Sequence, residues 1–189
     1  MQLYPYQKEG VEWLLNRESG ILADSVGMGK TIQTIGVIQA LKPQRVLILC
    51  PAILKFQWRD EFYKFVDDLC WNILVVEGNA KARKNIWSMS KVNISPIIFI
   101  ANYELLLRDL PEISATYWDI IVADECTRLA NAHNKSYKAL YNIKSVRRIA
   151  LTGTPIINRP TDVWGPLNWC NPASMGKLRS FMDRYCVYN

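Results

Sequence analysis

Short apolar runs alternate with longer amphipathic segments along most of the chain. The runs are apolar almost throughout, which is typical of strands that are covered on both faces of a sheet. They are Gly20–Ala23, Val46–Cys50, Ile73–Val76, Ile97–Ile100, Ile120–Ala123 and Arg148–Leu151. The segments between them have helical spacing and are Gln7–Asn16, Lys30–Leu41, Ile53–Phe65, Lys81–Ser90, Tyr103–Arg108 and Ser136–Ile143. Alternating strands and helices predict an α/β fold, a parallel sheet with helices on both faces.

The alternation ends at Leu151, where a loop with Pro155 and Pro160 begins. Two further helices are predicted near Thr161–Cys170 and Lys177–Tyr188. We find no internal repeat, low-complexity stretch or interdomain linker. We therefore expect residues 1–189 to form a single domain.

Composition and charge narrow the class of protein only a little. Half of the residues are hydrophobic, and the net charge of +6 fits either a polyanionic partner or lysines scattered over the surface. The five cysteines lie far apart without a CxxC pair, which favours reduced thiols over disulfides or a zinc site. No apolar run approaches the roughly 20 residues of a membrane span, and no signal-peptide pattern opens the chain. These features predict a soluble intracellular protein without a membrane partner.

A glycine-rich loop follows the first predicted strand and leads into a helix. Glycines allow consecutive backbone amides to point inward at phosphate groups, and the new helix adds the positive end of its dipole. The lysine that follows can reach the terminal phosphates, and the next hydroxyl can ligate magnesium. A chance glycine turn is the alternative. We expect nucleotide binding through Gly27, Met28, Gly29, Lys30 and Thr31.

An acidic pair, Asp124 and Glu125, ends the apolar run that begins at Ile120. The carboxyl end of a buried strand faces the crevice where ligands bind in open α/β sheets. A carboxylate there suits magnesium, and the second acid suits the base that orients and deprotonates an attacking water. By itself the pair is also a common turn after a strand. Together with the glycine loop it predicts hydrolysis of a nucleoside triphosphate.

Two further segments have weaker signals. The amide of Gln7, before the glycine loop, offers the donor and acceptor that adenine recognition needs, although a glutamine at a helix start often has no such role. Thr152 and Thr154 flank a glycine after the last predicted strand. They fit a sensor of the γ-phosphate or a link to the acidic pair, and an ordinary turn fits equally well.

Several basic or aromatic residues are candidates for contact with a polyanion. One set consists of Lys55 to Arg59 after Pro51, Tyr103 after the strand that ends at Ile100, and Arg147–Arg148; another consists of Lys81, Arg83, Lys84 and Lys91. A solvated surface explains each of them as well.

Seven segments of the chain occur in one linked order. They are Leu3–Leu14, Ile21–Ile35, Cys50–Phe62, Asn102–Leu106, Asp124–Asn131, Leu151–Asn158 and Trp164–Pro172. In their order and in their residues they resemble the motifs of the first RecA-like lobe of helicase superfamily two, most closely that of the Swi/Snf-type DNA-translocating ATPases. The chain departs from that family's pattern at Ser25 and Val26 in the glycine loop and at Cys126 and Thr127 after the acidic pair.

The resemblance implies a three-layer RecA-like fold that uses ATP and Mg²⁺. It implies that Gln7 reads adenine, that Lys30 and Thr31 hold phosphates and magnesium, and that Asp124 and Glu125 serve metal and water. It also implies that the segments of Lys55 and Tyr103 lie along one strand of double-stranded DNA. By the same resemblance, Thr152 and Thr154 are expected to couple the state of the nucleotide to motion of the protein.

The same resemblance implies a second RecA-like lobe, whose arginines complete the ATP site in that family. We expect residues 1–189 to be the N-terminal lobe alone, and therefore to hydrolyse ATP weakly or not at all without that partner. Two other functions stay open at this point. One is a strand-separating helicase of the same superfamily that acts on RNA or DNA, and the other is a non-catalytic module that binds nucleotide or DNA.

Overall fold

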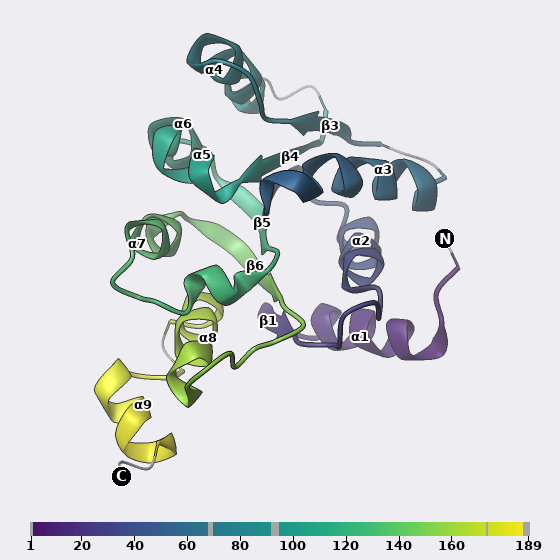
Figure 1. The fold of residues 1–189 in the computed structure, drawn as a ribbon. Helices are drawn as coiled ribbons and strands as arrows, with labels where there is room; N and C mark the ends of the chain where they lie inside the picture. The colour runs from purple at the N-terminus through teal and green to yellow at the C-terminus, as the bar shows by residue number, and fades with distance from the viewer. Residues whose placement is uncertain (1, 68–69, 92–94, 173, 187–189) are drawn as a thin grey trace.

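The computed structural model describes residues 2–67, 70–91, 95–172 and 174–186. Within these ranges, six strands form one sheet in the order β1-β6-β5-β2-β4-β3, and every neighbouring pair is parallel (Figure 1). The strands are β1 (Ser19–Leu22), β2 (Arg45–Cys50), β3 (Asn72–Val75), β4 (Ile97–Asn102), β5 (Trp118–Ala123) and β6 (Ser145–Leu151). Because all strands run the same way, their carboxyl ends meet at one edge of the sheet.

Helices cover both faces of the sheet, as the alternating pattern predicts (Figure 1). One face carries α1 (Pro5–Leu15), α2 (Lys30–Leu41) and α3 (Lys55–Phe65). The other carries α4 (Ala80–Ser88), α5 (Tyr103–Arg108), α6 (Leu110–Ser114), α7 (Lys135–Asn142) and α8 (Trp164–Cys170). The remaining elements are α9 (Leu178–Tyr185) and the 3₁₀ turns η1 (Ala52–Leu54), η2 (Met89–Lys91), η3 (Cys126–Leu129) and η4 (Pro160–Val163). This confirms the predicted three-layer α/β fold.

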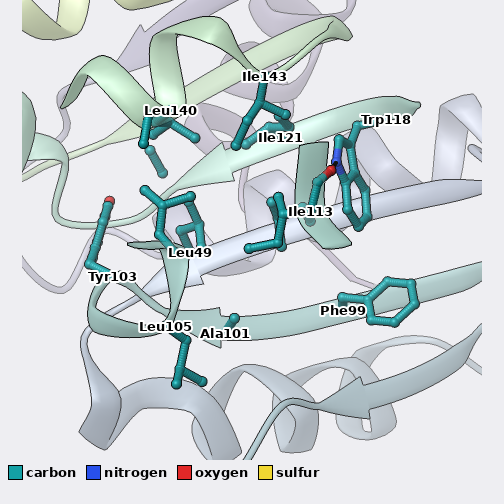
Figure 2. Close-up of a cluster of buried hydrophobic side chains, with 14 of the residues drawn as sticks. Leu49, Phe99, Ala101, Tyr103, Leu105, Ile113, Trp118, Ile121, Leu140 and Ile143 are labelled. Atoms are coloured by element: carbon teal, nitrogen blue, oxygen red, sulfur yellow. Dashed lines mark hydrogen bonds between the residues drawn. The ribbon is translucent and has the colours of Figure 1, made fainter. Parts of the chain in front are cut away.

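Two hydrophobic clusters lie on opposite faces of the sheet because successive side chains of a strand point in opposite directions. In β2, Val46 and Ile48 pack against α1, α2 and α3, whereas Leu47 and Leu49 face the other helices. Figure 2 shows part of the second cluster, where the ring of Phe99 lies near that of Trp118. Central strands are buried on both faces, which explains why their sequences are apolar without alternation.

Some elements differ from the sequence-based prediction. Strand β6 begins at Ser145, before the predicted start at Arg148, because Ser145 and Arg147 already pair with β5. The side chains of Arg147 and Arg148 bond to carbonyls of α1 and α8, which accommodates these polar residues in the strand. The short helix α6 was not predicted. The last helix ends at Tyr185, and the final predicted positions, 187 and 188, lie outside the described residues.

No helix in the described ranges combines the length and the apolar character needed to cross a membrane. The five cysteines are all free thiols, and Cys50, Cys126 and Cys170 are buried. Burial raises the pKa of the Cys50 thiol to about 12 and that of Cys170 to about 12.

Candidate nucleotide-binding site

The glycine loop, the acidic pair and the Thr152 segment meet at one edge of the sheet because β1, β6 and β5 are neighbours. A cavity of about 880 Å³ opens there, between α1, the glycine loop, α3 and the end of β5. Lys30, Thr31, Asp124 and Glu125 all line it. Residues nearly a hundred positions apart in sequence are thus brought together by the parallel topology.

The glycine loop has the backbone conformation that its sequence predicts. Gly27 and Gly29 adopt φ angles of 87° and 76°, in the left-handed region that a residue with a Cβ atom disfavours. Helix α2 starts immediately afterwards at Lys30. The Lys30 ammonium group donates to the carbonyl oxygens of Asp24 at 2.7 Å and Ser25 at 3.1 Å, so it lies over the loop.

Two glutamines brace this loop from the protein side. The Gln33 side-chain amide donates to Asp24 Oδ2 at 2.9 Å and to the Met28 carbonyl at 3.3 Å. Gln7 donates to the same Met28 carbonyl at 3.3 Å, and its Oε1 accepts a bond from the Tyr4 amide at 3.1 Å. Gln7 lines the cavity, yet in this structure both the nitrogen and the oxygen of its side-chain amide bond to protein groups.

Sequence reasoning gave Gln33 no role, although a signal was present. It stands with Thr34 between Ile32 and Ile35 in the sequence, and in α2 both polar side chains are fully buried. The contact between α1 and α2 is also close at this point. A Cβ atom on Gly10 would lie 1.9 Å from Gln33 Oε1, and one on Gly29 would lie 2.5 Å from Gln7 Nε2. Helix α1, the loop and α2 therefore form one interlocked unit.

Asp124 is a buried carboxylate, with 7% of its surface exposed. Its Oδ2 accepts a hydrogen bond from the Trp58 indole at 2.8 Å, and its Oδ1 accepts one from the Glu125 amide at 2.9 Å. Burial raises the pKa of this carboxyl group, while those two bonds and the charge of Lys30 act in the opposite direction. A buried anion with one cation near it is an environment that favours a further positive charge.

Glu125 adopts φ +49° and ψ +55°, a left-handed conformation that is uncommon for a residue with a side chain. The side chain is half-buried and lines the cavity beside Asp124. The next two residues are those that depart from the family pattern. Cys126 is buried, which raises the pKa of its thiol, and the Thr127 hydroxyl donates to the Glu125 carbonyl at 3.5 Å.

The Thr152 segment lies directly beside the glycine loop. Thr152 is 1% exposed, its amide donates to the Leu22 carbonyl at 3.2 Å, and its hydroxyl oxygen accepts the Thr154 amide at 3.0 Å. A Cβ atom on Gly153 would lie 3.7 Å from Lys30 Nζ. The two threonines thus order a tight turn within reach of the lysine, whereas their coupling role stays a prediction.

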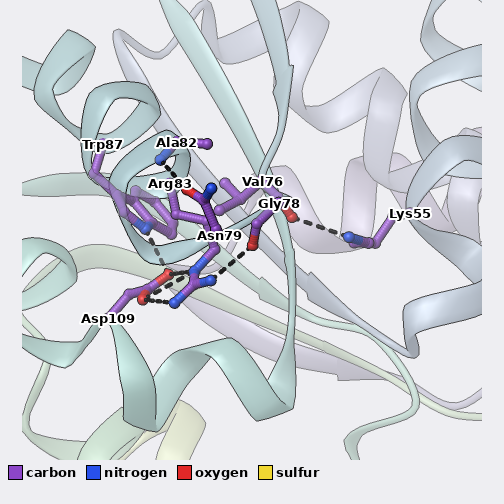
Figure 3. Close-up of polar contacts among 8 residues, drawn as sticks. All are labelled: Lys55, Val76, Gly78, Asn79, Ala82, Arg83, Trp87 and Asp109. Atoms are coloured by element: carbon purple, nitrogen blue, oxygen red, sulfur yellow. Dashed lines mark hydrogen bonds and ion pairs between the residues drawn. The ribbon is translucent and has the colours of Figure 1, made fainter.

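Lys55 and Tyr103, the two residues that the resemblance places beside DNA, are both buried. Lys55 is 9% exposed, and its ammonium group donates to the Val76 carbonyl at 2.9 Å (Figure 3). Tyr103 is 3% exposed, and its hydroxyl donates to the Asp124 carbonyl at 2.8 Å. Both polar groups are therefore used inside the protein, and contact of these two residues with DNA stays a prediction.

Three of the other basic candidates are also internal. Arg83 forms a buried ion pair with Asp109, with Nε 2.8 Å from Oδ2. Arg147 donates to the carbonyls of Leu14 and Arg17 at the end of α1. Arg148 donates to three carbonyl groups, those of Trp169, Tyr141 and Ile143. Of these basic candidates, Lys81, Lys84 and Lys91 are exposed.

A glycine loop with its lysine after one parallel strand, and an acidic pair after another, define the chain as a P-loop domain of the RecA-like α/β class. A family model described as the SNF2-related domain matches residues 6–187. The chain therefore belongs to the SNF2-related family, which confirms the resemblance seen in the sequence.

Curated relatives agree with this assignment. The chain is 34% identical to the "Putative ATP-dependent helicase/translocase YwqA" of Bacillus subtilis, over 98% of this chain and 21% of that protein. It is 30% identical to the "ISWI chromatin-remodeling complex ATPase ISW1" of Saccharomyces cerevisiae, over 96% of this chain and 17% of that protein. The human "DNA repair and recombination protein RAD54B" is 34% identical, over 97% of this chain and 22% of that protein.

Solved structures show the same fold. The Sulfolobus solfataricus SWI2/SNF2 ATPase core in complex with dsDNA has a TM-score of 0.83 and 34% identity, covering 97% of this chain and 38% of that chain. The core domain from the same organism, solved separately, has a TM-score of 0.77 and 32% identity, again over 97% of this chain and 38% of that chain. The chain thus spans about a fifth of the curated relatives and under two fifths of the solved cores.

Proposed function

We propose that this chain is the N-terminal, ATP-binding lobe of an ATP-dependent translocase on double-stranded DNA. The observation that carries the proposal is the cavity that Lys30, Thr31, Asp124 and Glu125 line together. Names of relatives that include ATP-dependent helicase, translocase and remodelling ATPase support it. A protein that works on DNA has an intracellular location, which is part of the same proposal.

The residues present fit a magnesium nucleotide. The hydroxyl of Thr31 and the carboxylate of Asp124 are hard oxygen donors of the kind that Mg²⁺ prefers, and both line the same cavity. Mg²⁺, when bound, neutralises charge on the β- and γ-phosphates. In the proposal Lys30 and the loop amides hold the phosphates, and Glu125 orients and deprotonates the attacking water.

Two further roles at this site belong to the proposal. Adenine recognition by Gln7 requires its amide to exchange the present bond to Met28 for one to the base. The turn at Thr152 and Thr154 lies beside Lys30, so a change at the terminal phosphate can be passed to it.

DNA and a second lobe are the proposed partners. Duplex DNA is supported by the dsDNA complex of the similar archaeal core. The second lobe is supported by the share of the solved cores that this chain leaves unmatched. In comparable NTPases an arginine supplied from outside the P-loop domain is worth about 10³–10⁵ in rate. We therefore expect strong ATP turnover only when both lobes are present.

The test measures nucleotide binding by this chain, and ATP turnover by the protein that carries it together with its second lobe. Lys30→Ala should abolish nucleotide binding, and Glu125→Gln should retain binding while turnover with duplex DNA is lost. Lys144→Ala and Glu77→Gln, both at exposed positions outside the cavity, are the matched controls. Equal turnover in the wild type and in Glu125→Gln would remove the base assignment. An ATP turnover rate that does not change when duplex DNA is added would contradict the proposed translocase function.

A further inference from the structure

Asp124 is held by hydrogen bonds at each of its polar atoms. Its amide donates to the Leu49 carbonyl at 2.8 Å, which ties it to strand β2. Its two carboxylate oxygens accept from the Trp58 indole and the Glu125 amide. Its carbonyl accepts from the Tyr103 hydroxyl at 2.8 Å. The side chains of Trp58 and Tyr103 come from separate helices, so two elements converge on this one residue.

Trp58 approaches the carboxylate from the protein interior. It lies on α3, is 1% exposed, and packs beside Phe62 with ring centroids 6.4 Å apart. An indole nitrogen is a donor only, and a fully buried indole ring has little freedom to rotate. The bond to Oδ2 therefore fixes the plane of the carboxylate, whose remaining lone pairs are left for the cavity that Asp124 lines.

Tyr103 stabilises the unusual turn at Glu125. The pairing of β5 with β6 ends at Ala123, so the carbonyl of Asp124 has left the ladder of the sheet. The left-handed conformation of Glu125 is disfavoured for a residue with a Cβ atom, and such turns persist only where the surroundings hold them. The buried hydroxyl of Tyr103 supplies the partner that this carbonyl would otherwise lack.

We propose that Trp58 and Tyr103 are positioning residues of the nucleotide site: Trp58 orients the Asp124 carboxylate toward magnesium, and Tyr103 holds the turn that presents Glu125. The proposal rests on the proposed function, because it assigns both residues to the magnesium nucleotide. It gives the buried hydroxyl of Tyr103 a task inside the lobe.

The first experiment titrates Mg²⁺ against this chain at a fixed concentration of a non-hydrolysable ATP analogue and follows binding by calorimetry. In Trp58→Phe the half-saturating Mg²⁺ concentration should rise roughly 10-fold, as for loss of a partner that orients a metal ligand. Nucleotide affinity in EDTA should stay unchanged. The control is Trp71→Phe, because Trp71 is also buried and its indole donates to the Pro43 carbonyl at 2.8 Å, away from the site.

The second experiment measures amide hydrogen exchange across residues 124–129 in Tyr103→Phe. Exchange of the Glu125 amide should accelerate roughly 10-fold relative to the wild type, because a stabilising bond of the turn is lost. Tyr137→Phe is the control, since Tyr137 is equally buried and its hydroxyl accepts a bond from Asn168. This variant keeps the proposal testable if Trp58→Phe does not fold.

A double-mutant comparison separates positioning from a general loss of stability. In an Asp124→Asn background, Trp58→Phe should add no further change in Mg²⁺ dependence, because the two substitutions act on one interaction. Equal Mg²⁺ curves for Trp58→Phe and Trp71→Phe, or equal exchange in Tyr103→Phe and Tyr137→Phe, would overturn the assignment of that residue. A wild type that binds the analogue without any Mg²⁺ dependence would instead overturn the proposed magnesium site itself.

Discussion

Replacing Asp109 with alanine removes the acceptor that joins α4 to the junction between α5 and α6 (Figure 3). Arg83 donates to this carboxylate through Nε at 2.8 Å and Nη2 at 2.9 Å, and the Trp87 indole donates at 3.0 Å. Asp109 and Arg83 are 6% and 8% exposed. The pair is therefore a buried, bidentate ion pair with an additional donor.

The magnitude follows from what Asp109→Ala leaves behind. The Arg83 guanidinium would keep its bond to the Gly78 carbonyl but lose its counter-charge, and the Trp87 indole would lose its acceptor. Breaking a buried ion pair at one end costs about 3–5 kcal/mol. For a chain of this size that corresponds to a melting temperature lower by roughly 6–20 °C. Asp109→Asn keeps a neutral acceptor, so its loss should be smaller.

The same pair predicts a pH dependence. Burial opposes ionisation of Asp109, but hydrogen bonds from Arg83 and Trp87 outweigh it, so the pKa of this carboxyl group is lowered. A carboxyl group whose pKa is lower in the folded state makes its full contribution to the stability of the fold at pH values above its unfolded pKa, about 3.9 for Asp. That contribution is lost as pH falls through the lower, folded pKa. Asp109→Asn should lack this part of the acid sensitivity.

Urea unfolding followed by circular dichroism measures the loss, with an unchanged m-value as the sign that the transition stays two-state. Asp60→Ala is the control, because its ion pair with Arg59 has a similar 2.8 Å distance but both side chains are exposed. A surface pair of this kind contributes about 0–1 kcal/mol. If Asp109→Ala costs no more than Asp60→Ala, the reasoning from burial is refuted.

Three other substitutions probe the unit formed by α1, the glycine loop and α2. Gly29→Ala should lower nucleotide affinity at least 10-fold in calorimetry, because φ is 76° and the new Cβ would lie 2.5 Å from Gln7 Nε2. The same substitution at Gly10 should lower the unfolding free energy by about 1–3 kcal/mol in urea, since the Cβ would displace the buried Gln33 amide. Arg147→Met should cost about 1.5–3 kcal/mol in thermal unfolding by releasing carbonyls at the end of α1, with faster hydrogen exchange in that helix. Unchanged affinity or stability would contradict each in turn.

The sequence predicts the fold well because covered parallel strands produce apolar runs that are easy to recognise. It also predicts that Lys30 and Asp124 share an edge, since both follow strands that run in the same direction. The order of the strands is a different matter. The placement of β6 between β1 and β5 brings the Thr152 turn beside Lys30, and this depends on long-range pairing that no local pattern records.

The direction of single side chains is what sequence reasoning missed. A lysine or tyrosine after a strand has the same local pattern whether it faces solvent or the interior. For Lys55 and Tyr103, the seating of α3 and α5 on the sheet decides the matter, and it turns both inward. Trp58 matches the family pattern at its position, but only the geometry shows that its indole bonds to Asp124.

The inward basic groups also change what the net charge of +6 means for DNA binding. Lys55, Arg83, Arg147 and Arg148 all count toward that charge, yet their donors bond to carbonyls or to Asp109 inside the protein. The salt dependence of binding reports phosphates that are neutralised by direct contact, not the formal charge of a chain. A DNA contact made by this lobe therefore depends on exposed cations and main-chain amides at the surface, and its salt dependence should be shallower than the basic residue count implies.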